Sequence, residues 1–244
     1  LGGVVRLSNA FDFYSLPGVG TAIWAAVTGG GSRAAPCPSI GSVCCPLRGE
    51  LACGDGWSLA HLEDGALRLL LVDGLGHGEA AAEATQRAIE VFDAHAREPP
   101  ERLVDRIHQA LRTTRGAAVG IATVPPHAGT LDYTGVGNIA GAILPPDDPA
   151  RGRGLTSHNG TAGYLAPRIS TMAYAWPEDG LLVPHTDGLL SRYVLARYPG
   201  IMRRHPAIIA GILYRDFSRG RDDVGVLVTR TPTAPAPPRG DDRE

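Results

Sequence analysis

The sequence predicts an α/β sandwich, in which helices cover antiparallel sheets, rather than a repeated βαβ unit. Short apolar segments with strand character recur from residue 41 to residue 230. Two helical segments, Glu79–His95 and Glu101–Arg112, follow one another directly between strands, whereas a βαβ unit would place its second strand after the first helix. The 244 residues are 43% hydrophobic and 20% charged, so the chain can bury a sizeable core.

The N-terminal part differs in composition from the rest. Residues 1–28 predict a short helix, a strand, a glycine turn at Pro17–Thr21 and a closing strand, a set too small to form a core by itself. Residues 29–40 are rich in glycine and proline and predict a flexible linker. We therefore expect a fragment at 1–28, a main domain at 41–230 and a disordered tail at 231–244.

Within the main domain, continuous or alternating apolar runs predict strands. The segment from residue 194 to residue 214 is predicted to be mostly helical, with breaks at Pro199 and Pro206. The predicted strands are Ser42–Leu47, Trp57–Leu62, Leu67–Val72, Ala117–Val124, Leu131–Val136, Ala140–Leu144, Leu181–Thr186 and Val224–Thr229.

The composition excludes several classes of function. A net charge of −2 leaves no basic surface for nucleic acid or anionic lipid, and no apolar run approaches the roughly 20 residues that span a membrane. All 23 basic residues are arginine, which excludes the lysine of a P-loop and every Schiff-base mechanism. No secretory signal is recognisable, so we expect a cytoplasmic protein. Because the chain starts at Leu1 rather than Met, we also expect it to be a fragment.

Four cysteines lie within 17 residues, at positions 37, 44, 45 and 53. A zinc site would have paired short spacings, and no histidine lies among these cysteines. We interpret them as reduced thiols, with zinc binding as the weaker alternative.

Aspartates recur at the ends of predicted strands. Asp73 and Asp187 follow apolar runs, Asp55 lies in a glycine turn, and Asp222 and Asp223 precede the last strand. One Asp–Gly pair is only a good turn, but four such places can bring carboxylates together at one edge of a sheet. Unpaired carboxylates repel one another and lose hydration, and divalent cations with oxygen ligands relieve both costs.

The order of these motifs resembles the SpoIIE-type bacterial serine/threonine phosphatases, metal-dependent protein phosphatases of the type 2C fold. The resemblance extends over about residues 41–230 and includes CGDG, DGLGHG, TRGAAVGIATV, GVGN, HTDG and RDDVGVLV. It implies a four-layer sandwich with two central antiparallel β-sheets flanked by helices. It also implies a cytoplasmic hydrolase of signal transduction that acts on phosphoserine or phosphothreonine.

Carried over residue by residue, the resemblance implies two ions, Mn²⁺ or Mg²⁺. Asp73 would bridge them and the Gly74 carbonyl would bind one of them. Asp55, Asp187 and Asp222 would complete the ligand shell, directly or through water. A hydroxide that bridges the two ions would attack phosphorus in line, so no side chain would become phosphorylated.

Neighbouring residues are predicted to support this site. His77 and Asp223 would lie just outside the ligand shell. Asn138 is predicted to be a turn residue rather than a ligand. His185 precedes Asp187 by two positions, which predicts the same strand face, and we interpret it as a buried, hydrogen-bonded histidine rather than a catalytic acid.

The sequence departs from the family pattern at two points. Gly225 stands where the family often has threonine, which should alter packing more than chemistry. No arginine matches the phosphate-binding arginine that eukaryotic relatives carry near the N-terminus, so the substrate-binding residues stay unassigned. Arg221, beside the acidic pair, is a candidate for contact with a phosphoprotein.

Residues 1–28 resemble the end of an anti-sigma-factor kinase domain of the GHKL ATPase type. The resemblance implies a parent chain with kinase-like and phosphatase modules in tandem, and no complete ATP pocket in this chain. It also implies partner switching, in which a phosphorylated antagonist of the STAS type is the substrate.

Two other functions stay open. A type 2C fold without turnover would be a binding module for a phosphorylated partner. The run from Leu67 through GLGHGEAA imitates a dinucleotide fingerprint, and Asp93 lies 20 residues beyond Asp73. However, the third glycine comes one position early, and Asp73 would place negative charge beside a pyrophosphate.

Overall fold

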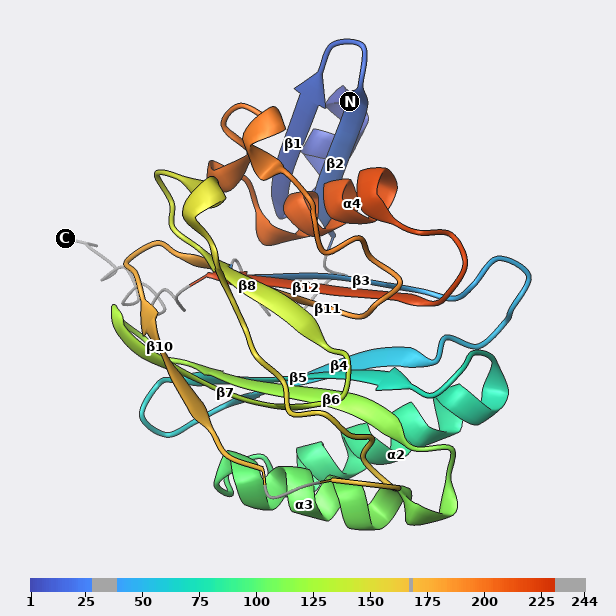
Figure 1. Ribbon diagram of the computed structural model, residues 1–244. Coiled ribbons are helices and arrows are strands. Elements are labelled where there is room, and N and C mark those ends of the chain that lie inside the picture. Colours follow the sequence, from blue (N-terminus) through green and yellow to red (C-terminus); the bar gives the residue numbers. More distant parts are fainter. Residues whose placement is uncertain (28–38, 167–168, 231–244) are drawn as a thin grey trace, which may run out of the picture.

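The computed structural model describes residues 1–27, 39–166 and 169–230. Two five-stranded antiparallel sheets lie face to face, and helices cover the outer side of each (Figure 1). The strand orders are β10-β7-β6-β5-β4 in one sheet and β3-β12-β11-β8-β9 in the other. The predicted four-layer sandwich is therefore confirmed. None of the helices in these ranges is both long and apolar enough to cross a bilayer.

The helices are α1 (Gly2–Leu7), α2 (Glu79–His95), α3 (Pro100–Ala110) and α4 (Pro206–Phe217). Short 3₁₀ turns lie at Leu111–Thr113, Pro149–Arg151, Leu195–Arg197 and Ile201–Arg203. The strands are β1 (Ala10–Leu16), β2 (Gly20–Ala26), β3 (Ile40–Cys45), β4 (Asp55–His61), β5 (Leu67–Gly74), β6 (Ala117–Val124), β7 (Gly129–Val136), β8 (Ala140–Leu144), β9 (Arg153–Gly154), β10 (Met172–Trp176), β11 (Leu181–His185) and β12 (Val224–Arg230).

Alternation along the strands separates the layers. In β5, Leu70 and Val72 pack against α2 and α3, whereas Leu69 and Leu71 pack between the sheets. On β12, Val226 belongs to the core under α4. Successive side chains point to opposite faces of a strand, so a buried strand contributes side chains both to the core between the sheets and to the core under the helices.

The structure corrects several predicted boundaries. β4 begins at Asp55, which was expected in a turn, and β5 continues through Gly74, so the ends of both strands include acidic residues. The segment predicted to be mostly helical over 194–214 has the expected breaks at Pro199 and Pro206, but its first half forms only two 3₁₀ turns, and α4 begins at Pro206. Proline is favoured at the first position of a helix, where its missing N–H needs no partner. Strands β9 and β10 were not predicted.

The order of strands and helices also decides against a dinucleotide-binding unit. β5 is followed by α2 and α3, and the next strand, β6, pairs with β5 in the antiparallel direction. A dinucleotide fingerprint needs a parallel βαβ unit. This alternative is therefore wrong.

The N-terminal hairpin packs on the main domain. Tyr14 of β1 is buried in the core under α4, and the ring of Trp24 on β2 stacks on that of His205 at 3.7 Å between centroids. Asp12 accepts hydrogen bonds from the backbone N–H of His205 (2.7 Å) and from Arg204. The hairpin therefore does not stand apart as a separate fragment. Most of the predicted linker and the whole predicted tail lie outside the described residues, but Ile40 already belongs to β3.

Candidate active site

Two aspartates face each other across neighbouring strands. Asp55 at the start of β4 is directly opposite Asp73 near the end of β5, in the same register that pairs Trp57 with Leu71. Leu71 and Trp57 pack between the two sheets. Because side chains alternate along a strand, Asp55 and Asp73 continue this inner row to the edge of the sandwich.

The electrostatic environment of this pair is unfavourable for negative charge. Burial raises the pKa of Asp55 to about 8, and the charge of Asp73 adds to the effect. Burial likewise raises the pKa of Asp73 to about 7, with Asp187 and Asp222 as the next causes. No arginine or histidine pairs with any of these four aspartates within the described ranges. Direct ion pairs therefore do not offset the repulsion among these carboxylates.

Thr186 links the second sheet to Asp55. Its hydroxyl donates a hydrogen bond to Asp55 Oδ2 (2.7 Å), and the backbone N–H of Gly225 donates to Thr186 Oγ1 (2.8 Å). A Cβ on Gly225 would lie 3.1 Å from Thr186 Cγ2 and 3.3 Å from Asp55 Oδ2. The glycine at position 225 thus leaves room for this hydrogen-bonded pair.

Asp187 and Asp222 approach from loops of the same second sheet. Asp187 follows β11, is exposed, and accepts a hydrogen bond from Asn138 Nδ2 (2.8 Å) in the turn between β7 and β8. Asp222 precedes β12 and accepts from the backbone N–H of Asp223 (2.9 Å). Burial raises the pKa of Asp222, and neighbouring aspartates add to this. Asn138 is thus a turn residue that also holds a carboxylate.

Asp223 organises the loop behind Asp55. Its buried carboxylate accepts hydrogen bonds from the backbone N–H groups of Leu47 (2.6 Å) and Gly54 (2.7 Å). The side chain therefore fixes the segment that leads from β3 into β4, which positions Asp55.

The glycine turn after β5 carries the remaining predicted residues. Gly74 is buried, and its N–H donates to the carbonyl of Gly54 (3.0 Å). A Cβ on Gly74 would lie 2.4 Å from the carbonyl oxygen of Ala81 on α2. His77 is exposed, and its Nδ1 lies 2.7 Å from Oε1 of Glu50. A backbone this close to α2 admits only glycine at position 74.

His185 is the buried histidine that the sequence predicts. Its Nδ1 lies 2.8 Å from the carbonyl oxygen of Thr186, and its ring packs edge-on against Tyr193. Burial lowers its pKa. β11 ends at His185, so Asp187 lies just beyond the strand, and the residue between them, Thr186, points to Asp55.

An open pocket of about 430 Å³ lies at this edge of the sandwich. Asp73, Asp187 and Asp222 line it together with Asn138 and with neutral residues of the adjoining loops. Asp55 lies behind it, opposite Asp73. The structure thus brings together carboxylates from four separate segments of the chain.

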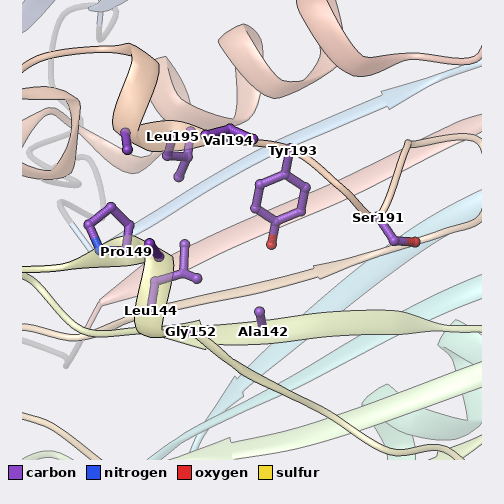
Figure 2. A pocket seen from close by; sticks show the side chains of 10 residues that line it. Ala142, Leu144, Pro149, Gly152, Ser191, Tyr193, Val194 and Leu195 are labelled. Carbon is purple, nitrogen blue, oxygen red and sulfur yellow. The ribbon is translucent and has the colours of Figure 1, made fainter.

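Figure 2 shows a different pocket, of about 320 Å³, between β8 and the loop that contains Ser191 and Tyr193. The Tyr193 hydroxyl points into it. Its lining residues include no carboxylate. The chemistry therefore belongs to the aspartate pocket.

The donor set of the aspartate pocket fits hard divalent cations. Four carboxylates without a cationic partner match the oxygen ligands that Mg²⁺ and Mn²⁺ prefer, and binding such ions would offset the repulsion among them. As they stand, no three histidine, cysteine, aspartate or glutamate side chains in the described part of the chain are gathered closely enough to hold a metal ion. The fit is therefore one of donor chemistry.

Thr186 and Asn138 were not predicted as partners of the aspartates. Both contacts join residues far apart in sequence, Thr186 to Asp55 and Asn138 to Asp187. Alternation from the buried Leu182 of β11 would have placed Thr186 on the inner face, so the sequence contained one usable signal for it.

Comparison with known proteins places this geometry in a family. The family model of "Stage II sporulation protein E (SpoIIE)" matches residues 63–232, which include Asp73, Asp187 and Asp222 but not Asp55. The phosphoserine phosphatase RsbX of Bacillus subtilis (strain 168) is 26% identical over 144 residues, which cover 58% of this chain and 69% of RsbX.

Solved structures share the fold. One from work on the bacterial stressosome, a modular system adapted to control secondary messenger signalling, is 27% identical with a TM-score of 0.69, covering 79% of this chain and 98% of that chain. The structure of RsbX in complex with magnesium is 20% identical with a TM-score of 0.66, covering 79% and 95%.

Proposed function

The chain belongs to the SpoIIE family of type 2C phosphatases, and from this premise we propose that it is a metal-dependent phosphatase of phosphoserine or phosphothreonine on a regulatory protein. One observation carries the proposal. Asp73, Asp187 and Asp222 line one pocket, Asp55 lies opposite Asp73, and no basic side chain neutralises them in the described structure.

In this proposal Asp55, Asp73, Asp187, Asp222 and the Gly74 carbonyl would hold two divalent cations. When bound, such ions neutralise phosphoryl oxygens and make water a stronger nucleophile near neutral pH. The magnesium complex of RsbX supports a divalent ion, and Mn²⁺ remains the other candidate.

The chain's own hydrogen bonds would orient these ligands. Thr186 holds the Oδ2 atom of Asp55, and Asn138 holds the Oδ2 atom of Asp187. Asp223 keeps the segment before β4 in place through two backbone N–H groups. His77 would lie beside the site, tied to Glu50.

The reaction is hydrolysis of a phosphate monoester. Water adds its oxygen to phosphorus, the bond between phosphorus and the side-chain oxygen breaks, and the proton that water loses is balanced by the one that the released alcohol takes up. The products are inorganic phosphate and unmodified serine or threonine.

A protein suits this site better than a metabolite as a substrate. The pocket is open, and the chain has no lysine with which to hold the phosphates of a nucleotide. An exposed phosphoserine on a protein surface could reach it, with affinity distributed over the surrounding contacts. The likeness to RsbX and to a stressosome protein favours a regulatory partner, and we propose a phosphorylated antagonist of the STAS type.

The proposal also includes the parent chain and the cellular location of the enzyme. The N-terminal hairpin would descend from a GHKL-type kinase module on the same parent chain. Cys44, Cys45 and Cys53 are free thiols, which supports a reducing, cytoplasmic location.

Hydrolysis of p-nitrophenyl phosphate in Mn²⁺ or Mg²⁺ tests the enzyme function. We expect Asp73→Asn and Asp187→Asn to lower the rate by orders of magnitude while circular dichroism shows an unchanged fold. Asp105→Asn, an exposed position on α3, is the matched control and should retain full activity. Turnover by the Asp73→Asn variant close to that of the wild type would contradict the proposal. A folded wild type that binds phosphoprotein but never hydrolyses it would favour the alternative of a binding module.

A further inference from the structure

Arg115 lies at the rim of the aspartate pocket. Its guanidinium Nη1 lies 3.1 Å from the position that a Cβ on Gly76 would occupy, and Gly76 lines the pocket. Leu75 and Gly76 belong to the turn that follows Asp73. The guanidinium group is therefore held against the same turn that leads out of the site.

The backbone around Arg115 is fixed on two sides. The N–H of Leu75 donates to the carbonyl of Gly116 (3.0 Å), and Ala117 and Ala162 exchange two backbone hydrogen bonds of 3.0 and 2.9 Å. Gly116 has a φ of +77°, and a Cβ there would lie 2.5 Å from the carbonyl oxygen of Ala162. Because the neighbouring segments 75–76 and 159–161 both line the pocket, this arrangement holds residue 115 at its edge.

The charge of Arg115 is available. The side chain is exposed, and within the described ranges it forms neither an ion pair nor a hydrogen bond. On the other side of the turn, the carboxylate of Glu50 lies 3.0 Å from a Cβ position on Gly78, but it is already engaged with His77. Arg115 is thus a free cation next to a pocket whose lining residues include no basic side chain.

We propose that Arg115 binds the phosphoryl oxygens of the substrate and of the product phosphate. This inference rests on the proposed function. A pocket whose charged lining residues are all carboxylates repels a phosphate dianion, and divalent cations at the aspartates would attract it from one side only. A guanidinium group donates two parallel N–H bonds to a phosphoryl group, which fixes its orientation as well as its position. Arg115 is then a binding and orienting residue, and its ligand is the phosphate group rather than the alcohol.

Binding of inorganic phosphate to the manganese-loaded protein is the direct test, measured by calorimetry and as competitive inhibition of p-nitrophenyl phosphate hydrolysis. We expect Arg115→Ala to weaken phosphate binding roughly 10- to 100-fold and to raise KM, because a charge-assisted hydrogen bond is lost. Arg115→Lys should recover part of the affinity, since it keeps the charge but not the planar fork. The manganese-induced rise in Tm should be the same in all variants.

Arg112→Ala is the matched control. Arg112 is exposed on the 3₁₀ turn just before Arg115 and likewise forms no recorded ion pair in the described part of the chain. Its removal changes net charge equally and should leave phosphate binding unchanged. If Arg115→Ala and Arg112→Ala weakened phosphate binding equally, the change in net charge would explain the effect, and the inference would be overturned.

The outcomes separate the inference from the proposed function. An Arg115→Ala variant with wild-type phosphate affinity and KM overturns the inference alone, while hydrolysis continues. Phosphate binding that depends on Arg115, in a wild type that hydrolyses no phosphoester, supports the inference and contradicts the enzyme function. A folded wild type that binds no phosphate in manganese overturns both.

Discussion

Burial raises the pKa of Asp55 from 3.8 to about 8 and that of Asp73 from 3.8 to about 7, and the charges of neighbouring aspartates add to both effects. At a pH between the ordinary and the raised pKa, each of these carboxyl groups keeps its proton in the folded protein, whereas the unfolded chain has already released it. The unfolded state therefore binds fewer protons, so stability falls as pH rises from about 4 to about 8. A divalent cation bound to these carboxylates would stabilise their charged form and so remove this fall in stability with rising pH.

The corresponding prediction concerns the metal-free protein in chelator. We expect its urea midpoint to fall as the pH is raised through this window, and we expect Asp55→Asn to reduce the slope, because asparagine does not titrate. Urea unfolding at a series of pH values measures both. If Asp55→Asn and the wild type had the same slope, the raised pKa of Asp55 would be refuted.

Thr186 is the second residue whose effect can be measured in isolation. Thr186→Val keeps the shape but leaves Asp55 Oδ2 and the Gly225 N–H without their partner, which should destabilise the fold by about 1–3 kcal/mol. Thr186→Ser keeps the hydroxyl and should lose much less. Denaturation of both variants without metal provides the comparison, and a valine variant as stable as the serine variant would exclude this role.

Among the elements, the N-terminal hairpin is the one whose packing on the main domain was not predicted. Alternation gives it two unlike faces: Tyr14, Leu16 and Trp24 pack toward α4, whereas Phe13 and Ile23 are about half exposed on the other side. The stacked ring of His205 and the carboxylate of Asp12 fix the hairpin at the start of α4. We infer that the hairpin stabilises the phosphatase domain itself.

A pair of alanine variants tests this coupling. Trp24→Ala removes the stacked ring and should lower the stability of the whole domain by about 2 kcal/mol, in one cooperative transition. Ile23→Ala, on the exposed face of the same strand, is the control and should change little. Two separate transitions, with the main one unaffected by Trp24→Ala, would show that the hairpin unfolds independently.

At the scale of the whole molecule, the aspartates come from both sheets, so a cation bound among them would link the two halves of the sandwich. Binding to the folded state alone raises stability by mass action. We expect millimolar Mn²⁺ to raise Tm by several degrees, and Asp73→Asn to abolish most of that rise. Thermal melts over a manganese titration measure it, with Asp105→Asn as the control. An unchanged Tm in the wild type would contradict a preformed acidic site.

Much of this architecture was predictable because its signals are local. Apolar runs of strand length define β5, β6 and β12, alanine content and proline define α2, and the aspartates next to glycines mark the segments that meet at the site. The resemblance in motif order carried the fold and the family, which the structure and the family comparison confirm.

The partners of these aspartates were decided by the tertiary structure. Strand periodicity places Asp73 at the end of a strand, but only the antiparallel register of β4 and β5 sets it opposite Asp55. Thr186, Asn138 and Arg115 contact segments distant in sequence, and strand alternation gives a local signal for Thr186 alone. For the same reason the short strand β10 and the packing of the N-terminal hairpin on the main domain escaped prediction. The residues by themselves thus determine which groups are available, and the packing of the two sheets determines which of them meet.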